Sequence, residues 1–124
     1  MKIFLAEDNE DNYLVVKSNL RKLKTPIELI WAQDGQIAMD MLAHEEKIDL
    51  FLIDIEMPFI NGIELTKWIR EQERFAKATI IAVTASVFAE MKKMYLEKGF
   101  DFILEKPFFR EDFLQMLEKN VGLS

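Results

Sequence analysis

Five polar residues of types used in phosphoryl chemistry each lie at or just after the end of a short apolar run: Glu7, Asp8, Asp54, Thr84 and Lys106. If those runs are neighbouring strands, the three carboxylates converge. At about 5 Å and an effective dielectric constant near 20, each pair of them repels by roughly 3 kcal/mol. We therefore expect positive charge at this place, one unit from Lys106 and the rest from a hard cation bound by oxygen ligands, for which Mg²⁺ is well suited.

Such a set of groups favours transfer of a phosphoryl group, because that reaction mainly requires positioning and neutralisation of charge. In this hypothesis Asp54 attacks phosphorus to give an acyl phosphate, while Glu7 and Asp8 hold Mg²⁺ directly or through water. Lys106 pairs with one phosphoryl oxygen and Thr84 donates a hydrogen bond to another. Taken singly, most of these residues have structural alternatives: Asp8 or Asn9 could cap a helix, Thr84 could do the same, and Lys106 could be a solvated surface lysine.

The apolar runs are short enough to be strands, and the segments between them have the spacing of amphipathic helices. Strand and helix alternate five times, which predicts a parallel sheet with helices on both faces, a doubly wound α/β fold. In such folds functional groups gather at the carboxyl ends of the strands. The expected strands are Ile3 to Ala6, Ile27 to Ala32, Leu50 to Asp54, Thr79 to Val83 and Phe102 to Leu104.

The composition is that of one globular domain covering residues 1–124: half of the residues are apolar, 31% are charged and none is cysteine. No apolar stretch is long enough for a signal peptide or a membrane span, so we expect a cytoplasmic protein. A net charge of -6 disfavours nucleic acid as a partner. The last helix is expected to end near Asn120, which predicts no output domain and either a stand-alone regulator or a receiver from a longer kinase.

The order and spacing of the polar motifs resemble those of response-regulator receiver domains of two-component signalling, over essentially the whole chain. The motifs are Glu7-Asp8-Asn9, Asp54-Ile55-Glu56-Met57-Pro58, Asn61-Gly62, Val83-Thr84-Ala85 and Lys106-Pro107-Phe108. The resemblance implies a flavodoxin-like sheet with strand order 2-1-3-4-5 and a monomer. It also implies that Asp54 receives phosphate from a phosphohistidine of a sensor histidine kinase or phosphotransfer protein. Mg²⁺ would then be bound by Glu7, Asp8, Asp54 and the backbone carbonyl of Glu56, and the phosphorylated domain would contact a downstream protein target. The Ala6-to-Asn9 and Asp34-Gly35-Gln36 segments resemble single-domain regulators and hybrid-kinase receivers.

One position departs from the family pattern. Receivers commonly carry an aromatic residue three positions before the lysine, and its inward turn accompanies movement of the threonine; here that position is Ile103. The neighbouring Phe102 should face the other side of its strand. We therefore expect a switch that relies on Thr84 and the loop after the fourth strand, with Ile103 moving little. Glu56 and Ser86 flank the expected path of the hydrolytic water and should influence the rate of dephosphorylation.

Several aromatic and methionine side chains near the last two helices could form either core or a partner-binding face: Met91, Met94, Tyr95, Phe108, Phe109 and Phe113. Core packing is expected for at least half of them, with Phe109 the better candidate for exposure. Trp68 is expected in the core, and His44 at a solvated helix end. Two rival functions are an aspartyl-phosphate phosphatase or transferase, for which the chain offers no spare segment to form a substrate cap, and a plain flavodoxin-like binding module, for which no phosphate loop follows the first strand.

Overall fold

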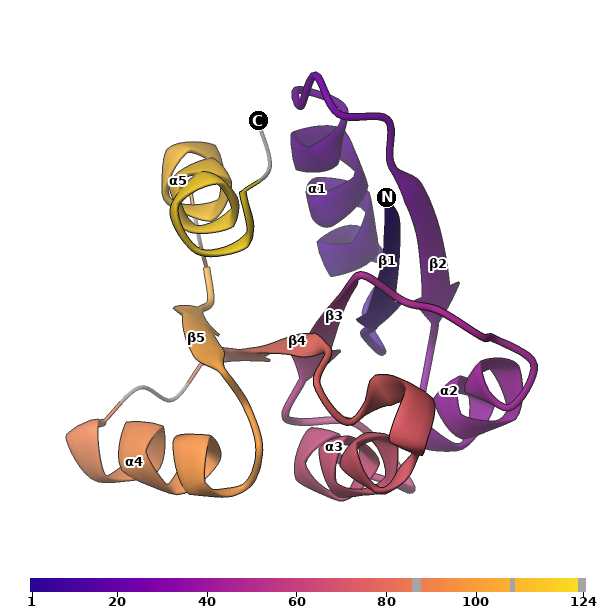
Figure 1. Ribbon diagram of the computed structural model, residues 1–124. Coiled ribbons are helices and arrows are strands. Elements are labelled where there is room, and N and C mark those ends of the chain that lie inside the picture. The colour runs from indigo at the N-terminus through magenta and orange to yellow at the C-terminus, as the bar shows by residue number, and fades with distance from the viewer. Residues whose placement is uncertain (86–87, 108, 123–124) are drawn as a thin grey trace.

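Strands and helices alternate along the whole chain in the computed structural model, which describes residues 1–85, 88–107 and 109–122 (Figure 1). The strands are β1 (Lys2–Ala6), β2 (Glu28–Ala32), β3 (Leu50–Asp54), β4 (Thr79–Thr84) and β5 (Phe102–Glu105). The helices are α1 (Glu10–Leu20), α2 (Gly35–Leu42), α3 (Gly62–Glu71), α4 (Ala89–Glu97) and α5 (Arg110–Val121), with a 3-10 turn over Glu73–Phe75. The predicted α/β alternation is confirmed.

The five strands form one fully parallel sheet in the order β2-β1-β3-β4-β5, as the resemblance implied. The pairing register sets Ala6 beside Ile53, Asp54 beside Val83, and Thr84 beside Glu105. The carboxyl ends of β1, β3, β4 and β5 therefore meet at one edge of the sheet. This is the edge at which doubly wound folds carry their functional groups.

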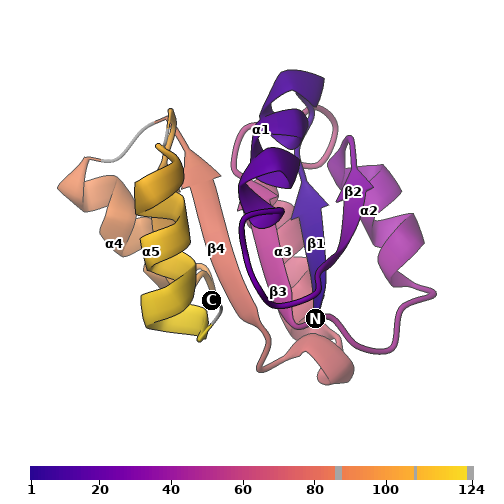
Figure 2. The ribbon, with the colours of Figure 1, turned by 90° about the horizontal axis from the view of Figure 1, so that it is seen from above.

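Helices cover both faces of the sheet, α1 and α5 on one side and α2, α3 and α4 on the other (Figures 1 and 2). Alternate strand residues supply the two cores because successive side chains of a strand point to opposite faces. Phe4, Phe51 and Ile80 pack toward α2, α3 and α4. Ile3 and Leu52 pack toward α1 and α5. Burial on both faces is the reason why the strands are nearly continuous apolar runs.

Asparagine and aspartate side chains fix where the first three helices begin. Asn9, Asp34 and Asn61 each accept a hydrogen bond from the backbone N–H three residues on, which caps α1, α2 and α3. Asn9 is thus the cap and Asp8 is left for another role. Thr84 does not cap α4, which begins five residues later behind Phe88.

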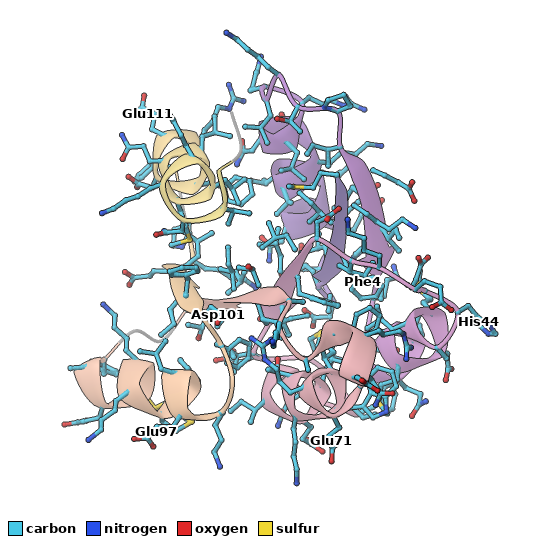
Figure 3. All side chains as sticks on the ribbon, in the orientation of Figure 1. Phe4, His44, Glu71, Glu97, Asp101 and Glu111 are labelled. Atoms are coloured by element: carbon cyan, nitrogen blue, oxygen red, sulfur yellow. The ribbon has the colours of Figure 1, made fainter. Side chains whose placement is uncertain are left out.

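The predicted strand limits agree with the observed ones to within one residue, and α5 ends one residue beyond the expected place. The 3-10 turn was not anticipated. Tyr95 and Phe113 are buried, whereas Phe109 is 77% exposed, as expected. Met91, Met94 and Trp68 are partly buried and pack against the core. His44 is exposed just beyond α2 (Figure 3). Phe108 and Ser86 lie outside the described residues. Within the described part of the chain, no helix has the length and apolarity that crossing a bilayer requires.

Candidate functional site

Three carboxylates gather where β1 and β3 end. Glu7, Asp8 and Asp54 each place one carboxylate oxygen within 4.8 Å of the other two. Glu7 and Asp54 are 2% and 3% exposed, whereas Asp8 faces solvent. At this separation and an effective dielectric constant of 20, two like charges repel by about 3 kcal/mol. The convergence predicted for these residues is therefore present, with one member accessible from outside.

Lys106 bridges the two buried carboxylates from the loop after β5. Its Nζ lies 3.1 Å from Oε2 of Glu7 and 3.1 Å from Oδ2 of Asp54. Burial alone would lower the pKa of the Lys106 ammonium, but the charges of Glu7 and Asp54 outweigh it and raise this pKa above its usual value. Lys106 thus remains protonated at neutral pH. The alternative of a solvated surface lysine is excluded.

The two oxygens of Asp54 have different partners. Oδ1 accepts a hydrogen bond of 3.1 Å from the backbone N–H of Glu56, and Oδ2 faces Lys106. Burial, and then the negative charge of Glu7, raise the pKa of Asp54 to about 7, although Lys106 and the Glu56 amide oppose the rise. A carboxylate with this pKa is poorly neutralised by its surroundings and remains available to a further cation or an electrophile.

Gly62 lets α3 approach the backbone of Asp54. A Cβ at this position would lie 2.3 Å from the Asp54 carbonyl oxygen and 2.8 Å from Cα of Ile55. The Gly62 N–H also donates to the Ile55 carbonyl at 2.9 Å. Only glycine fits here, so the Asn61-Gly62 pair serves both to start α3 and to hold the β3 terminus in place.

Glu7 is held by residues that the sequence did not single out for this task. Its Oε1 accepts from the Asn12 side-chain amide at 3.2 Å and from the Asn9 N–H at 3.3 Å. The Trp31 indole N–H donates to the Glu7 backbone carbonyl at 2.8 Å, and its ring stacks on Tyr13 with centroids 4.0 Å apart. A half-buried tryptophan near the end of a strand signals a polar partner for its N–H, but the identity of that partner depends on which strands are neighbours.

Thr84 and Glu56 are also at this edge. Thr84 ends β4, is 1% exposed, and accepts the backbone N–H of Lys106 on its carbonyl at 2.8 Å. The side chain of Glu56 is exposed, while its backbone N–H contacts Asp54. The structure therefore brings together Glu7, Asp8, Asp54 and Lys106, with Thr84 and Glu56 on the adjoining strand end and loop.

Ile103 lies on the face of β5 that packs against α2, α3 and α4, and it is partly buried. Its partner on β4 is Ala82. Phe102 packs with the opposite core, beneath α1 and α5. The two residues face opposite sides of the sheet, as predicted.

The donor set suits a hard divalent ion. All three clustered ligands are carboxylates, no cysteine exists in the chain, and the Lys106 ammonium offsets one of the three negative charges. Oxygen ligands with open coordination positions are what Mg²⁺ uses when it also binds phosphate oxygens and water. A buried carboxylate with a cation-binding cluster on one side and a lysine on the other defines a class of protein: a phosphoryl-acceptor domain of α/β fold.

Comparison with known proteins identifies the family. The profile of the response regulator receiver domain matches residues 3–118, so the chain belongs to that family. It is a receiver domain of two-component signalling, a type of domain whose general function is to accept a phosphoryl group and act as a switch. Receiver domains interact with histidine kinases or phosphotransfer proteins and with downstream targets.

Relatives include both long kinases and short regulators. The chain is 36% identical over 107 residues to the autoinducer 2 sensor kinase/phosphatase LuxQ of Vibrio parahaemolyticus, a match covering 86% of this chain and 12% of LuxQ. It is 28% identical to the polar-differentiation response regulator DivK of Brucella anthropi, covering 97% of this chain and 95% of DivK. The chain thus spans a small part of the first relative and nearly all of the second, in line with the two kinds of receiver that the motifs resemble.

The solved receiver domain of the sensor histidine kinase PA1611 from Pseudomonas aeruginosa has the same fold. It superposes with a TM-score of 0.84 at 30% identity, covering 98% of this chain and 97% of that domain. That structure carries a magnesium ion coordinated in its active site cleft.

Proposed function

We propose that Asp54 is the phosphoryl acceptor of this receiver, and that it takes the group from a phosphohistidine of a histidine kinase or phosphotransfer protein. The observation that carries the proposal is the bridge made by Lys106 between two buried carboxylates, Glu7 and Asp54, beside the exposed Asp8. An ion pair with only a structural role would be weakened by a third carboxylate such as that of Asp8, which lies within 4.8 Å of the other two and adds repulsion.

In the proposed reaction a carboxylate oxygen of Asp54 attacks phosphorus. The new oxygen–phosphorus bond forms as the phosphorus–nitrogen bond of phosphohistidine breaks, and the imidazole nitrogen keeps the bonding electrons. Lys106 then exchanges its contact with Oδ2 of Asp54 for one with a phosphoryl oxygen, while its contact with Glu7 anchors the ammonium. The Glu56 N–H, which already holds Oδ1, orients the carboxylate for in-line attack.

Thr84 completes the set of groups around the phosphoryl oxygens. It ends the strand next to that of Asp54, and its side chain is buried at the same edge. We assign its hydroxyl to a hydrogen bond with a phosphoryl oxygen, which would draw the loop after β4 toward the site.

The proposal includes Mg²⁺ as cofactor, for which the carboxylate cluster and the PA1611 receiver are the support. Its ligands would be Glu7, Asp8, Asp54 and the backbone carbonyl of Glu56. When bound, the ion supplies positive charge that the phosphoryl oxygens need during transfer. Glu7 is pre-oriented for this role by Asn12 and Asn9 before any ion binds.

We further propose that the domain is a monomeric cytoplasmic switch rather than a turnover enzyme, and that it signals through contacts with a downstream protein. The space of about 360 Å³ beside Lys106 is walled by Asn12, Val15, Ala85 and Pro107. Those side chains offer few groups to hold an extended phosphoester, which disfavours the rival phosphatase.

Incubation with Mg²⁺ and acetyl phosphate, followed by intact mass measurement, tests the assignment. The wild type should gain the mass of one phosphoryl group, and Asp54→Asn should gain none. Asp40→Asn is the matched control because Asp40 is an exposed acid on α2; it should be labelled like the wild type. Labelling of Asp54→Asn to the wild-type extent would refute the assignment, and repeated turnover of unrelated phosphoesters would favour the phosphatase.

A further inference from the structure

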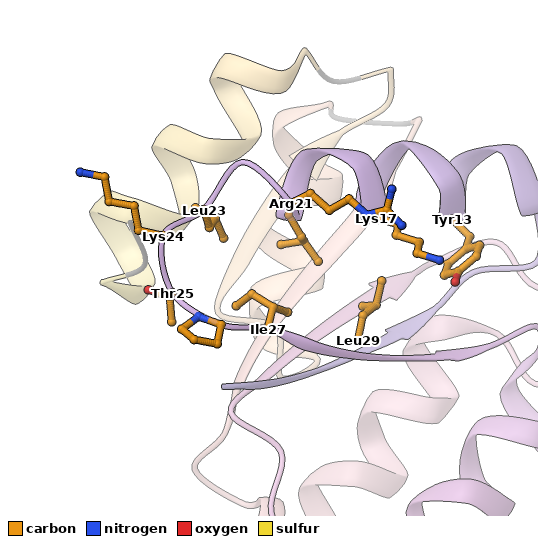
Figure 4. A pocket seen from close by; sticks show the side chains of 10 residues that line it. Tyr13, Lys17, Arg21, Leu23, Lys24, Thr25, Ile27 and Leu29 are labelled. Atoms are coloured by element: carbon orange, nitrogen blue, oxygen red, sulfur yellow. The ribbon is translucent and has the colours of Figure 1, made fainter.

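Another hollow, which none of the carboxylates of the cluster lines, lies between α1, the following loop and the edge strand β2 (Figure 4). Its volume is about 420 Å³, within the range of sites that bind side chains or small ligands. Leu20, Leu23, Ile27 and Leu29 give it an apolar floor. Ile27 and Leu29 point from the sheet toward α1, as Figure 4 shows.

Positive charge surrounds this floor. Residues 12–27 contain Lys17, Arg21, Lys22 and Lys24 and no aspartate or glutamate, in a chain whose net charge is -6. Lys17, Arg21 and Lys24 line the hollow. Among the described residues, no carboxylate lies within salt-bridge distance of these three cations, whereas Lys2, Lys47, Arg70 and Lys106 all have one.

Helix electrostatics explain only part of this pattern. Lysine and arginine near the C-terminal end of a helix are stabilised by its dipole, which accounts for Lys17 and Arg21. Lys22 and Lys24 lie beyond the regular end of α1 at Leu20. The dipole also gives no reason for a hollow with an apolar floor under the cations.

The adjoining strand has an open edge. β2 is the first strand of the sheet and pairs on one side with β1 alone. The Glu28 N–H bonds to Met1, and the Ala32 carbonyl accepts from Glu7, so the even-numbered residues face β1. In a parallel ladder the alternate residues, Leu29 and Trp31, then direct their backbone groups to the open edge. Glu28, the acidic residue of this strand, lies on the other face from the hollow, because side chains alternate.

We propose that this hollow binds an acidic peptide segment of a protein partner, which adds to the open edge of β2 as a further strand. One apolar side chain of the segment would occupy the floor beside Leu29, and carboxylates on the same face would pair with Lys17 and Arg21. Charge complementarity commits the occupant to an acidic segment. A lipid surface fits less well because the apolar residues are recessed beneath the cations, whereas membrane-binding helices present their apolar face outward.

Titration of the ¹⁵N-labelled full chain with a peptide that carries glutamate, leucine and glutamate at every second position, with serine between them, tests this inference, because these three side chains then share one face of an added strand. The backbone amide signals of Leu29 and Trp31 should shift saturably, and a peptide with lysine in place of glutamate should leave them unchanged. Absence of shifts at millimolar peptide, or equal shifts with the lysine peptide, would overturn the proposal.

A variant pair tests the role of the charges. Lys17→Gln/Arg21→Gln should weaken peptide binding about tenfold or more, whereas Lys92→Gln/Lys93→Gln removes two exposed charges from α4 and should change it little. Equal affinity in the two variants would contradict the proposal, as would shifts of the same amides by phosphatidylglycerol vesicles without any by the peptide. Should the first variant fold poorly, the wild type gives the same information, because its affinity must fall steeply between low and high salt. Labelling of the variants by acetyl phosphate should be normal, so the result is independent of the function proposed for Asp54.

Discussion

Asp54 should make the metal-free protein less stable as the pH rises toward neutrality. Its pKa is raised from 3.8 to about 7 in the folded chain, by burial first and the charge of Glu7 second. Between these two values the folded protein holds a proton that the unfolded chain has released. The free energy of unfolding therefore falls with increasing pH across this window and levels off above about pH 7.

The size of the effect follows from the shift. Each pKa unit corresponds to 1.36 kcal/mol, so the contribution of Asp54 changes by about 2 kcal/mol between pH 5.5 and pH 8. Asp54→Asn removes the titration while keeping the size of the side chain and an oxygen for the Glu56 N–H. Relative to the wild type, this variant should thus gain about 2 kcal/mol on going from pH 5.5 to pH 8.

Urea unfolding followed by circular dichroism, in EDTA and at several pH values above the isoelectric point near 4.9, measures this difference. Asp49→Asn is an instructive control. The backbone N–H of Lys2 donates to Asp49 at 2.7 Å and lowers the pKa of this carboxyl, so the carboxylate stabilises the fold above its pKa and loses that effect in acid. Asp49→Asn should therefore be less stable than the wild type at every pH value measured. Parallel profiles for wild type and Asp54→Asn would refute the reasoning about the site.

Three more expectations concern the same region. Mg²⁺ at one hundred times its dissociation constant should stabilise the wild type by about 2.7 kcal/mol in thermal unfolding, with most of that gain absent in Asp8→Asn; an equal shift in both would contradict the assigned ligands. Gly62→Ala should cost about 3 kcal/mol, because its methyl group meets the Asp54 backbone, whereas Gly122→Ala, whose methyl meets nothing within 4 Å, should cost about 1 kcal/mol from its φ of +74°. Equal losses in urea unfolding would show that the contact is unimportant. Structures with and without a phosphoryl mimic should show Ile103 in one rotamer, and a large rotamer change would defeat the hypothesis that Thr84 and its loop suffice.

The alternation of strands and helices could be predicted because the three central strands, β1, β3 and β4, are buried on both faces. Such strands have no polar face, so their limits are marked by the first charged or small residue, as at Asp54 and Glu7. The order of the strands did not follow from periodicity and depended on the resemblance to a family. The 3-10 turn over Glu73–Phe75 left no periodic signal because it is only three residues long, although Phe75 is fully buried and packs edge-on against Phe51.

The site was predictable to the extent that its groups lie at strand ends. Glu7, Asp8, Asp54 and Lys106 lie at one edge because parallel strands end there, which the alternation of strands and helices implies; that they are close together also depends on β1 lying beside β3, which it does not imply. The contacts that hold Glu7 were not predictable in this way. Trp31 reaches the Glu7 carbonyl across the β1–β2 pair, so its role depends on which strands are neighbours and in what register.

The electrostatic cost of the site and its proposed function have a common origin. A buried carboxylate pair bridged by one lysine could be satisfied by replacing a carboxylate with a neutral residue, and the fold would be more stable for it. Asp54 instead remains incompletely neutralised, and its pKa is raised to about 7. Binding of a cation relieves this repulsion, so part of the stability lost by the metal-free fold reappears as affinity for the ion. Lys106 offsets only one of the three negative charges of the cluster. The negative charge that remains can bind a metal ion, and the carboxylate of Asp54 can then accept a phosphoryl group.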